Sequence, residues 1–214
     1  MTDRFPSDAR NESGNTPPDG RVALLCERLL ADDTKCISSI GCGSESGCAG
    51  QVAWQLAMAM TDQLSAKLPD AESVYETETN VLLIDADYGN ASLSTKLNRP
   101  LPGFAEILSG EAELWDTLIP CDQLHFMPYG DVGRKLGSAA FAHFLKSVRL
   151  TFDFVVFCMP PSYAHLAAKT DGVVVVIESN VTTRNDTRRM KRLLQRQEAR
   201  VLGAILHHHD RFSD

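Results

Sequence analysis

A glycine-rich stretch in the first third of the chain has the residue types of a phosphate-binding loop. It reads SSIGCGSESGCAGQVAWQLA over residues 38–57, with an apolar run before it and a helix-like apolar pattern after it. In such a loop, backbone N–H groups contact the phosphates, a lysine balances their charge and a hydroxyl holds Mg²⁺. Between Lys35 and Lys67 the chain has no Lys or Arg. The stretch therefore predicts a phosphate loop that lacks its cation.

Two registers place this stretch on the pattern G-x-x-x-x-G-K-[ST]. In the first, Gly43 is the first glycine, Cys48 stands at the second glycine, Ala49 at the lysine and Gly50 at the hydroxyl residue. In the second, shifted by one residue, Gly47 is the second glycine and Cys48 stands at the lysine. A plain strand-to-helix turn is the alternative to both. The candidate nucleotide-binding positions here are Gly43, Gly47, Cys48, Ala49, Gly50 and Gln51.

Two acids and a thiol follow later apolar runs. Asp85 and Asp87 end the stretch NVLLIDAD, and they are either ligands of a Mg²⁺ ion or a solvated pair that caps a loop. Cys158 ends the run DFVVFC, where a buried thiol is favoured over a nucleophile. A histidine run begins at His207. Because successive residues leaving a strand point to opposite faces, at most two of its histidines can share a metal ion.

Apolar runs alternate with helical patterns along the chain, and they are the elements that must position these residues. The predicted strands cover residues 35–40, 80–85, 124–130, 153–159, 172–179 and 201–206. The predicted helices cover residues 21–32, 48–66, 103–108, 111–119, 138–151 and 183–199. Continuous Val, Ile and Leu runs indicate strands covered on both faces, and alternation with helices indicates parallel pairing. The fold class is therefore α/β, with a doubly wound, mainly parallel sheet whose ligand crevice lies at the carboxyl ends of the strands.

Composition and charge narrow the class of protein. Of the 214 residues, 43% are hydrophobic, which suits one domain over residues 21–214, after a polar tail over residues 1–20 that we expect to be disordered. The formal net charge of −7 argues against a nucleic-acid partner, which requires a basic surface. No run approaches the length of a membrane span, and the first 20 residues lack the apolar core of a signal peptide. We therefore expect a cytoplasmic protein.

Two further clusters have both a structural and a functional interpretation. The six cysteines lack the paired spacing of a zinc site, so we expect reduced, buried thiols rather than a metal or redox centre. The helix over residues 183–199 carries many arginines around an apolar stripe. A solvated amphipathic helix is the default for this pattern, and a docking face for an acidic partner or a membrane surface is the alternative.

Taken in order, five segments resemble the bacterial tyrosine kinases of exopolysaccharide and capsule export. These kinases are a branch of the P-loop ATPases that also includes the ParA and MinD proteins. The segments are VLLIDADYGNASLSTKLN, GFAEILSGEAELWDTLI, FDFVVFCMPPS, TDGVVVVIESNVTTRNDTRRM and VLGAIL. The resemblance covers roughly residues 21–210 and implies a P-loop NTPase fold of the ParA/MinD-like branch.

The departures from this family indicate that its chemistry has decayed. Besides the missing lysine, Gly89 stands at an arginine of the kinases, Cys158 at an aspartate that organises Mg²⁺, and His207 at an asparagine near the base. The kinases end in a tyrosine cluster, whereas the last tyrosine here is Tyr163. The resemblance therefore implies a vestigial nucleotide site with weak binding of ATP or ADP with Mg²⁺, and phosphoryl transfer close to absent.

Three functions follow from the resemblance. The first is a catalytically degenerate binding or regulatory subunit of polysaccharide polymerisation and export. Its implied partner is the cytoplasmic end of a membrane polysaccharide co-polymerase of the Wzz-like type, which would bring the protein to the inner membrane as part of a homo- or hetero-oligomer. The second is a residual ATP-binding tyrosine autokinase or ATPase of the same pathway. The third, a ParA/MinD-type positioning ATPase, relies on an additional lysine early in the loop, which this chain lacks.

Overall fold

The computed structural model describes residues 20–43, 48–67, 79–87, 93–94, 102–121, 124–131 and 136–208. The predicted tail over residues 1–20 lies outside this part of the chain except for Gly20, which begins the first helix. Residues 68–78 and the stretch 88–92, which follows the paired acids and includes Gly89, lie outside it as well.

Seven strands form one sheet, close to the segments that the apolar runs predict. They are β1 (Cys36–Gly41), β2 (Val81–Asp85), β3 (Ile119–Cys121), β4 (Leu124–Met127), β5 (Phe154–Met159), β6 (Gly172–Glu178) and β7 (Val201–His207). The helices are α2 (Gly20–Ala31), α3 (Cys48–Ser65), α5 (Phe104–Ser109), α6 (Ser138–Thr151), α7 (Ala164–Ala167) and α8 (Arg184–Arg196), with 3-10 turns η1 (Leu114–Thr117) and η2 (Pro161–Tyr163).

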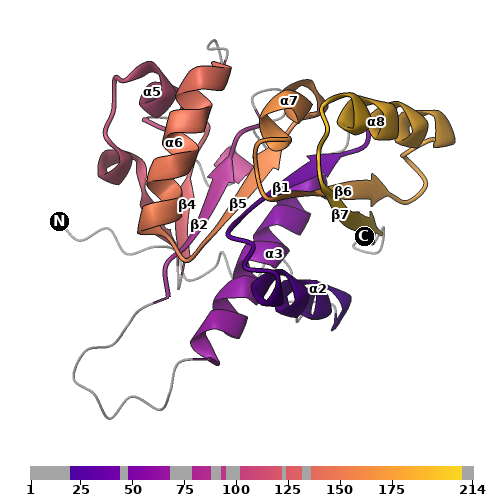
Figure 1. The fold of residues 1–214 in the computed structure, drawn as a ribbon, viewed down its shortest axis with the longest axis horizontal. Helices are drawn as coiled ribbons and strands as arrows, with labels where there is room; N and C mark the ends of the chain where they lie inside the picture. The colour runs from indigo at the N-terminus through magenta and orange to yellow at the C-terminus, as the bar shows by residue number, and fades with distance from the viewer. Residues whose placement is uncertain are drawn as a thin grey trace, which may run out of the picture.

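The strand order is β3-β4-β2-β5-β1-β6-β7. β3 runs antiparallel to β4, and every other pair is parallel. The predicted doubly wound, mainly parallel sheet is therefore confirmed. Because β1 lies inside the sheet, between β5 and β6, the glycine-rich stretch leaves from the interior of the carboxyl edge rather than from its rim (Figure 1).

Helices cover both faces of the sheet, as Figure 1 shows. α2 and α3 pack on one face through a cluster that includes Leu29 and Leu56. On the other face, α5 to α8 pack through a cluster that includes Phe104, Phe141 and Met190. All residues of β1, β2 and β5 are buried. Burial on both faces is why β2 and β5 have nearly continuous apolar runs instead of alternating ones, whereas β1 also buries the hydroxyls of Ser38 and Ser39. Each large side chain removed from water in this way contributes about 1.5–3 kcal/mol to folding.

The prediction of a helix over residues 111–119 is wrong. The segment forms the turn η1 and then β3, which pairs antiparallel with β4 at one end of the sheet. Pro120 lies in this edge strand, where its missing N–H does not interrupt a ladder on both sides. A strand of three residues gives no periodic signal, so the sequence pattern could not reveal it.

Within the described residues, no helix combines the length and apolar character that crossing a bilayer requires.

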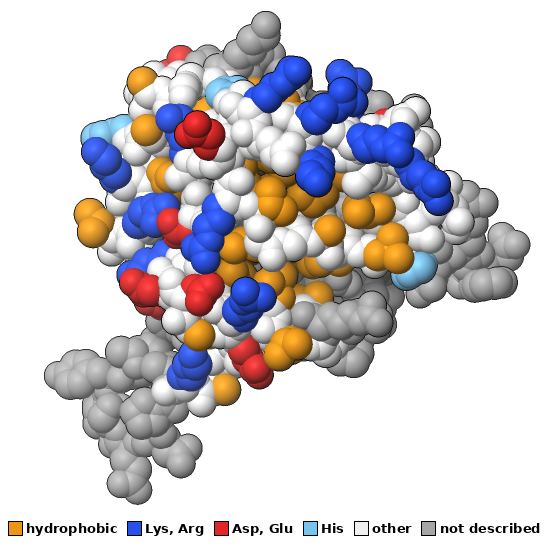
Figure 2. Space-filling view, turned by 45° about the vertical axis from the view of Figure 1, so that its right-hand side comes forward, with side chains coloured by type: hydrophobic (Ala, Val, Ile, Leu, Met, Phe, Trp, Pro, Cys, Tyr) orange, Lys and Arg blue, Asp and Glu red, His pale blue; other side chains and the backbone are white. Residues whose placement is uncertain are grey.

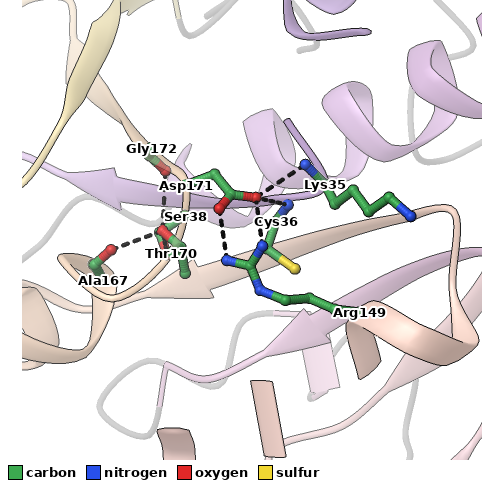
Figure 3. A network of polar contacts seen from close by, with 8 residues as sticks. All are labelled: Lys35, Cys36, Ser38, Arg149, Ala167, Thr170, Asp171 and Gly172. Atoms are coloured by element: carbon green, nitrogen blue, oxygen red, sulfur yellow. Dashed lines mark hydrogen bonds and ion pairs between the residues drawn. The ribbon is translucent and has the colours of Figure 1, made fainter. Parts of the chain in front are cut away.

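A charged cluster ties together the amino ends of β1 and β6 and the end of α6 (Figure 3). Asp171 accepts hydrogen bonds from the backbone N–H groups of Lys35 at 3.0 Å and Cys36 at 2.9 Å. It also accepts two from the guanidinium of Arg149, at 2.6 and 3.0 Å. Burial alone would raise the pKa of Asp171, but the hydrogen bond from Arg149 and those from the two backbone groups outweigh burial and lower the pKa. The ionised carboxylate therefore stabilises the fold.

Replacing Asp171 by asparagine is expected to lower the free energy of unfolding by about 1–3 kcal/mol, because Arg149 then loses its charged partner. The wild-type protein should lose this stabilisation as the pH falls from about 4 through the lowered pKa of Asp171, whereas the variant should not. Urea unfolding followed by circular dichroism at several pH values measures both effects.

The matched control is Asp32→Asn, which breaks the exposed pair that Asp32 forms with Arg200 at 3.2 Å. We expect this change to cost less than about 1 kcal/mol. Equal losses in the two variants would contradict the role assigned to Asp171.

Candidate functional site

The carboxyl ends of β1, β2, β5 and β6 share one edge of the sheet, and the loop after β1 begins there. Gly43 has a φ of 103°, a left-handed conformation that glycine adopts without strain. A Cβ atom added at Gly43 would meet nothing within 4 Å, so the backbone conformation rather than crowding requires glycine. The N–H of Cys42 donates to the carbonyl of Val176 at 2.8 Å, which holds the start of the loop against β6. Gly47 lies outside the described residues.

The first turn of α3 carries the other predicted loop positions. Cys48, Ala49 and Gly50 are buried, and Gln51 is half-buried. The hydroxyl of Ser39 in β1 donates to the carbonyl of Ala49 at 3.2 Å and so fixes the helix start against the strand. No charged side chain lies in this turn. The helix N-terminus therefore offers backbone N–H groups and its dipole to an anion, but no side-chain cation.

Asp85 ends β2, and its buried carboxylate is held from several sides. Ser94 donates to Oδ2 twice, from its N–H at 2.9 Å and from its hydroxyl at 2.6 Å. The N–H of Asp87 donates to Oδ1 at 3.2 Å. The hydroxyl of Ser94 in turn accepts from the N–H of Tyr129 at 3.0 Å. Both oxygens of Asp85 therefore already accept hydrogen bonds from the protein.

This environment does not suit a Mg²⁺ ligand. Burial raises the pKa of Asp85; the hydrogen bonds from Ser94 and Asp87 offset the rise only in part, and the charge of Asp87 adds to it. Mg²⁺ requires a near-octahedral set of oxygens whose lone pairs are available to it, and both oxygens of Asp85 already accept hydrogen bonds from Ser94 and Asp87. Among the described residues, no group of three or more His, Cys, Asp or Glu side chains is arranged to hold a metal ion. Asp85 is therefore better described as a buried hydrogen-bond acceptor than as an open ligand.

Two thiols border the same edge. Cys158 lies opposite Asp85 in the neighbouring strand. Burial raises the pKa of Cys158 well above its usual value, and the charges of Asp85 and Asp87 raise it further. Burial also raises the pKa of Cys48 to about 12, with further contributions from the charge of Glu178 and a hydrogen bond to it. Both thiols therefore remain protonated at neutral pH and are poor nucleophiles. None of the six cysteines forms a disulfide with another. Five are buried, as predicted, and Cys121 is half-buried.

Glu178 is a site residue that the sequence analysis did not single out. It ends β6, beside β1, and its charge and hydrogen bond reach Cys48 at the start of α3. Its Oε2 atom is buried and has no hydrogen-bond partner among the described residues. The available signal was its position, as an acid at the end of an apolar strand run. Glu178 adds another carboxylate to the edge that Asp85 and Asp87 occupy.

A cavity of about 750 Å³ opens beside Gly43, between η2 and α8. Its wall includes Arg189, Arg192 and Arg196, which are spaced three and four residues apart and therefore lie on one face of α8. The sequence predicted a solvated helix or a docking face here, but not that the arginines share a cavity with the loop glycine. The edge is thus acidic around Asp85 and basic along α8.

His207 lies apart from the paired acids. It ends β7 and pairs with Glu178 of β6. Four strand spacings separate β7 from β2, which corresponds to about 19 Å at about 4.8 Å per spacing. The structure therefore does not bring His207 together with Asp85. His208 follows the strand and is exposed, and His209 lies outside the described residues.

Known structures share this fold, although no family profile and no curated protein matches the chain. The kinase domain of the Escherichia coli tyrosine kinase ETK is 18% identical, with a TM-score of 0.73 over 100% of this chain and 84% of that chain. The chimerical protein CapA2B2 is 21% identical, with a TM-score of 0.72 over 95% of this chain and 90% of that chain. MinD from Pyrococcus horikoshii, complexed with Mg-ADP, is 21% identical, with a TM-score of 0.60 over 81% and 70%. The chain therefore has the P-loop NTPase fold of the ParA/MinD-like branch, shared with tyrosine kinase domains.

The buried thiols predict a simple pattern of chemical reactivity. In the native protein at pH 8, we expect Ellman's reagent to react promptly with the half-buried Cys121 alone, because burial keeps the other thiols protonated and covered. All six should react once the chain is unfolded in guanidinium chloride. The variant Cys121→Ser is the control and should lose the fast phase. A second prompt reaction that disappears in Cys48→Ser or Cys158→Ser would contradict this description of the edge.

The raised pKa of Asp85 predicts a pH-dependent stability. An acid whose pKa is raised on folding stabilises the native state at low pH, and this contribution is lost as the pH rises through the raised value. Asp85→Asn should remove this pH-dependent loss of stability, because asparagine does not titrate. The amide oxygen of the new side chain can still accept the hydrogen bonds from Ser94. Between pH 4 and pH 8 the variant should therefore gain stability relative to wild type, by about 1.4 kcal/mol for each unit of raised pKa. Thermal unfolding across this range measures the difference, and Asp62→Asn on the exposed face of α3 is the control. A parallel pH dependence in Asp85→Asn and wild type would contradict the prediction.

Proposed function

We propose that this chain is a degenerate relative of the exopolysaccharide tyrosine kinases that acts by binding rather than by phosphoryl transfer. Its role would be that of a regulatory or binding subunit in exopolysaccharide or capsule polymerisation and export. One observation carries the proposal. The carboxyl edge of the sheet carries Asp85, Asp87 and Glu178, while the loop that leaves β1 has no cation of its own.

The electrostatic balance at this edge disfavours phosphate. Two unit charges 4 Å apart near a protein surface interact by about 4 kcal/mol. A phosphate group next to Asp85 and Asp87 would meet unfavourable terms of this kind, and so would one next to Glu178. Three strand spacings, about 14 Å, separate β2 from β6, so the two positions oppose different parts of a triphosphate. The N-terminus of α3 offsets only about 0.3–1 kcal/mol through its dipole. Without a lysine in the loop, the protein supplies too little positive charge there to bind MgATP tightly.

The groups that remain are also poorly placed for catalysis. Asp85 already accepts hydrogen bonds from Ser94 and Asp87, so its lone pairs are not directed at a ligand. Cys158 is a protonated, buried thiol at the position where the kinases carry an aspartate that organises Mg²⁺. The nucleotide positions Gly43 to Gln51 are accordingly proposed to be vestigial, serving as a structural turn and helix start.

The resemblance to the kinases supplies the proposed partner and setting. The partner would be the cytoplasmic segment of a Wzz-like membrane polysaccharide co-polymerase, and the chain would work in the cytoplasm, held at the inner membrane through that partner. Residues 21–214 would form the single domain that makes this contact, in a homo- or hetero-oligomer. Nothing in this role requires ATP turnover.

A second candidate is residual nucleotide binding, and one observation favours it. Arg189 lines the cavity that Gly43 also borders, so a guanidinium is available beside the loop even though the loop has none of its own. A nucleotide held in this way would depend on α8 rather than on a loop lysine.

An ATP hydrolysis assay on the purified protein tests the first proposal. We expect no phosphate release above background, with the kinase domain of the Escherichia coli enzyme ETK assayed in parallel as the active control. Millimolar MgATP should shift the melting temperature by less than about 1 °C, which corresponds to roughly 0.5 kcal/mol for a chain of this size. Turnover that disappears in an Asp85→Ala, Asp87→Ala double variant would overturn the proposal.

The same thermal measurement distinguishes the second candidate, residual nucleotide binding, from the first proposal. If residual nucleotide binding holds, MgATP should raise the melting temperature by several degrees. Arg189→Gln should abolish the rise, while Arg188→Gln, at a position that does not line the cavity, should retain it. A rise that both variants retain would exclude α8 as its source.

A further inference from the structure

The groove along α8 has a basic wall and an apolar floor. Arg189, Arg192 and Arg196 line it, while Leu193 of the same helix and Pro161 of η2 add apolar surface. The three arginines are exposed, and none forms an ion pair with a described residue. Figure 2 shows the Lys and Arg side chains gathered across this part of the surface, beside a patch of hydrophobic side chains. We infer that this groove binds an acidic peptide segment, with apolar side chains, of a partner protein.

Charge complementarity identifies the occupant. The whole chain has a net charge of −7, yet α8 carries Arg184, Arg188, Arg189, Lys191, Arg192 and Arg196 against Asp186 alone. The carboxylate of Asp186 is already engaged, since it accepts from the N–H of Thr183 at 3.0 Å and from its hydroxyl at 2.6 Å in the cap of the helix. Asp186 also lines the groove and interacts electrostatically with Arg189, so it offsets one of the six positive charges of α8 and five remain. An acidic segment supplies the missing partners.

The packing of α8 favours a peptide over a membrane surface. The apolar residues Met190 and Leu194 are buried in the core, so the helix has no free apolar face to insert into lipid. The groove is concave, whereas a bilayer surface is flat. A concave site of about 750 Å³ lies within the size range of ligand pockets.

The length of the groove matches a short extended segment. From Asp186 to Arg196 the helix rises about 15 Å, at about 1.5 Å per residue. An extended peptide covers this length with about four or five residues, at about 3.3 Å each. Alternate side chains would then face the arginine wall and the apolar floor, which is why the expected segment combines acids with apolar residues.

The inference rests on the proposal that the domain works by binding a partner, but it is tested separately. Absence of ATP turnover concerns the acidic edge around Asp85, whereas peptide binding concerns the arginines of α8. Failure of the peptide to bind would leave the hydrolysis result unchanged, and detection of turnover would leave the peptide result unchanged.

The probe is a fluorescein-labelled peptide, EELYEELEE, titrated with the full chain and followed by fluorescence anisotropy. The neutral peptide QQLYQQLQQ is the control for charge. We expect saturable binding of the acidic peptide that weakens as salt is raised, and no saturable binding of the neutral peptide. The double variant Arg192→Gln, Arg196→Gln should weaken binding about fivefold or more.

The matched control is Arg188→Gln, Lys191→Gln, which removes the same charge from the same helix at positions that do not line the groove. It should change the affinity less than about twofold.

Equal losses in the two double variants would overturn the inference, because binding would then depend on charge alone. Displacement of the acidic peptide by MgATP at stoichiometric concentration would also overturn the inference, because the groove would then be a nucleotide subsite. Binding to vesicles of phosphatidylserine and phosphatidylcholine that requires Arg192 and Arg196, in a protein that does not bind the acidic peptide, would overturn it in favour of a lipid surface.

Discussion

The constraint that governs this protein is the concentration of negative charge at one edge of its sheet. Asp85, Asp87 and Glu178 lie at the ends of β2 and β6, and the loop that leaves β1 between them contributes no cation. The negative charge at the end of β2 is felt by Cys158 in the neighbouring strand, whose pKa is raised first by burial and then by Asp85 and Asp87. We propose that these carboxylates disfavour phosphate at the ends of β2 and β6. The proposed loss of catalysis follows from that balance rather than from any change in architecture.

The architecture itself is intact because it depends on other interactions. Continuous apolar strands between two helical layers supply most of the folding free energy, and they need nothing from the loop. At the opposite ends of the strands, the contacts of Asp171 with Arg149 and with the backbone of β1 fix how β1, β6 and α6 meet. The fold can therefore persist while the carboxyl edge changes its chemistry. The proposed loss of phosphate chemistry is therefore compatible with an intact sheet.

Much of the fold can be predicted from the sequence. The features that cannot be predicted have physical reasons for being hidden. The buried strands β2 and β5 were predictable because they are covered on both faces and so consist of apolar runs. The opposition of Asp85 and Cys158 was not predictable, because it depends on the strand order and register, which parallel pairing alone does not specify. The bonds from Ser94 to Asp85 depend on the path of a loop, which no periodic pattern specifies. Likewise, the helical spacing of Arg189 and its neighbours identifies a common face but not the cavity that this face borders.

The most direct test of the central claim is a calorimetric titration of the purified protein with MgATP at low ionic strength, where attraction to any cation would be strongest. The account predicts no saturable heat at nucleotide concentrations up to the millimolar range, because the carboxylates at the edge oppose the phosphates and no lysine balances them. A stoichiometric transition with micromolar affinity would contradict it, since an attraction of that size would require positive charge at the phosphates that this edge does not supply.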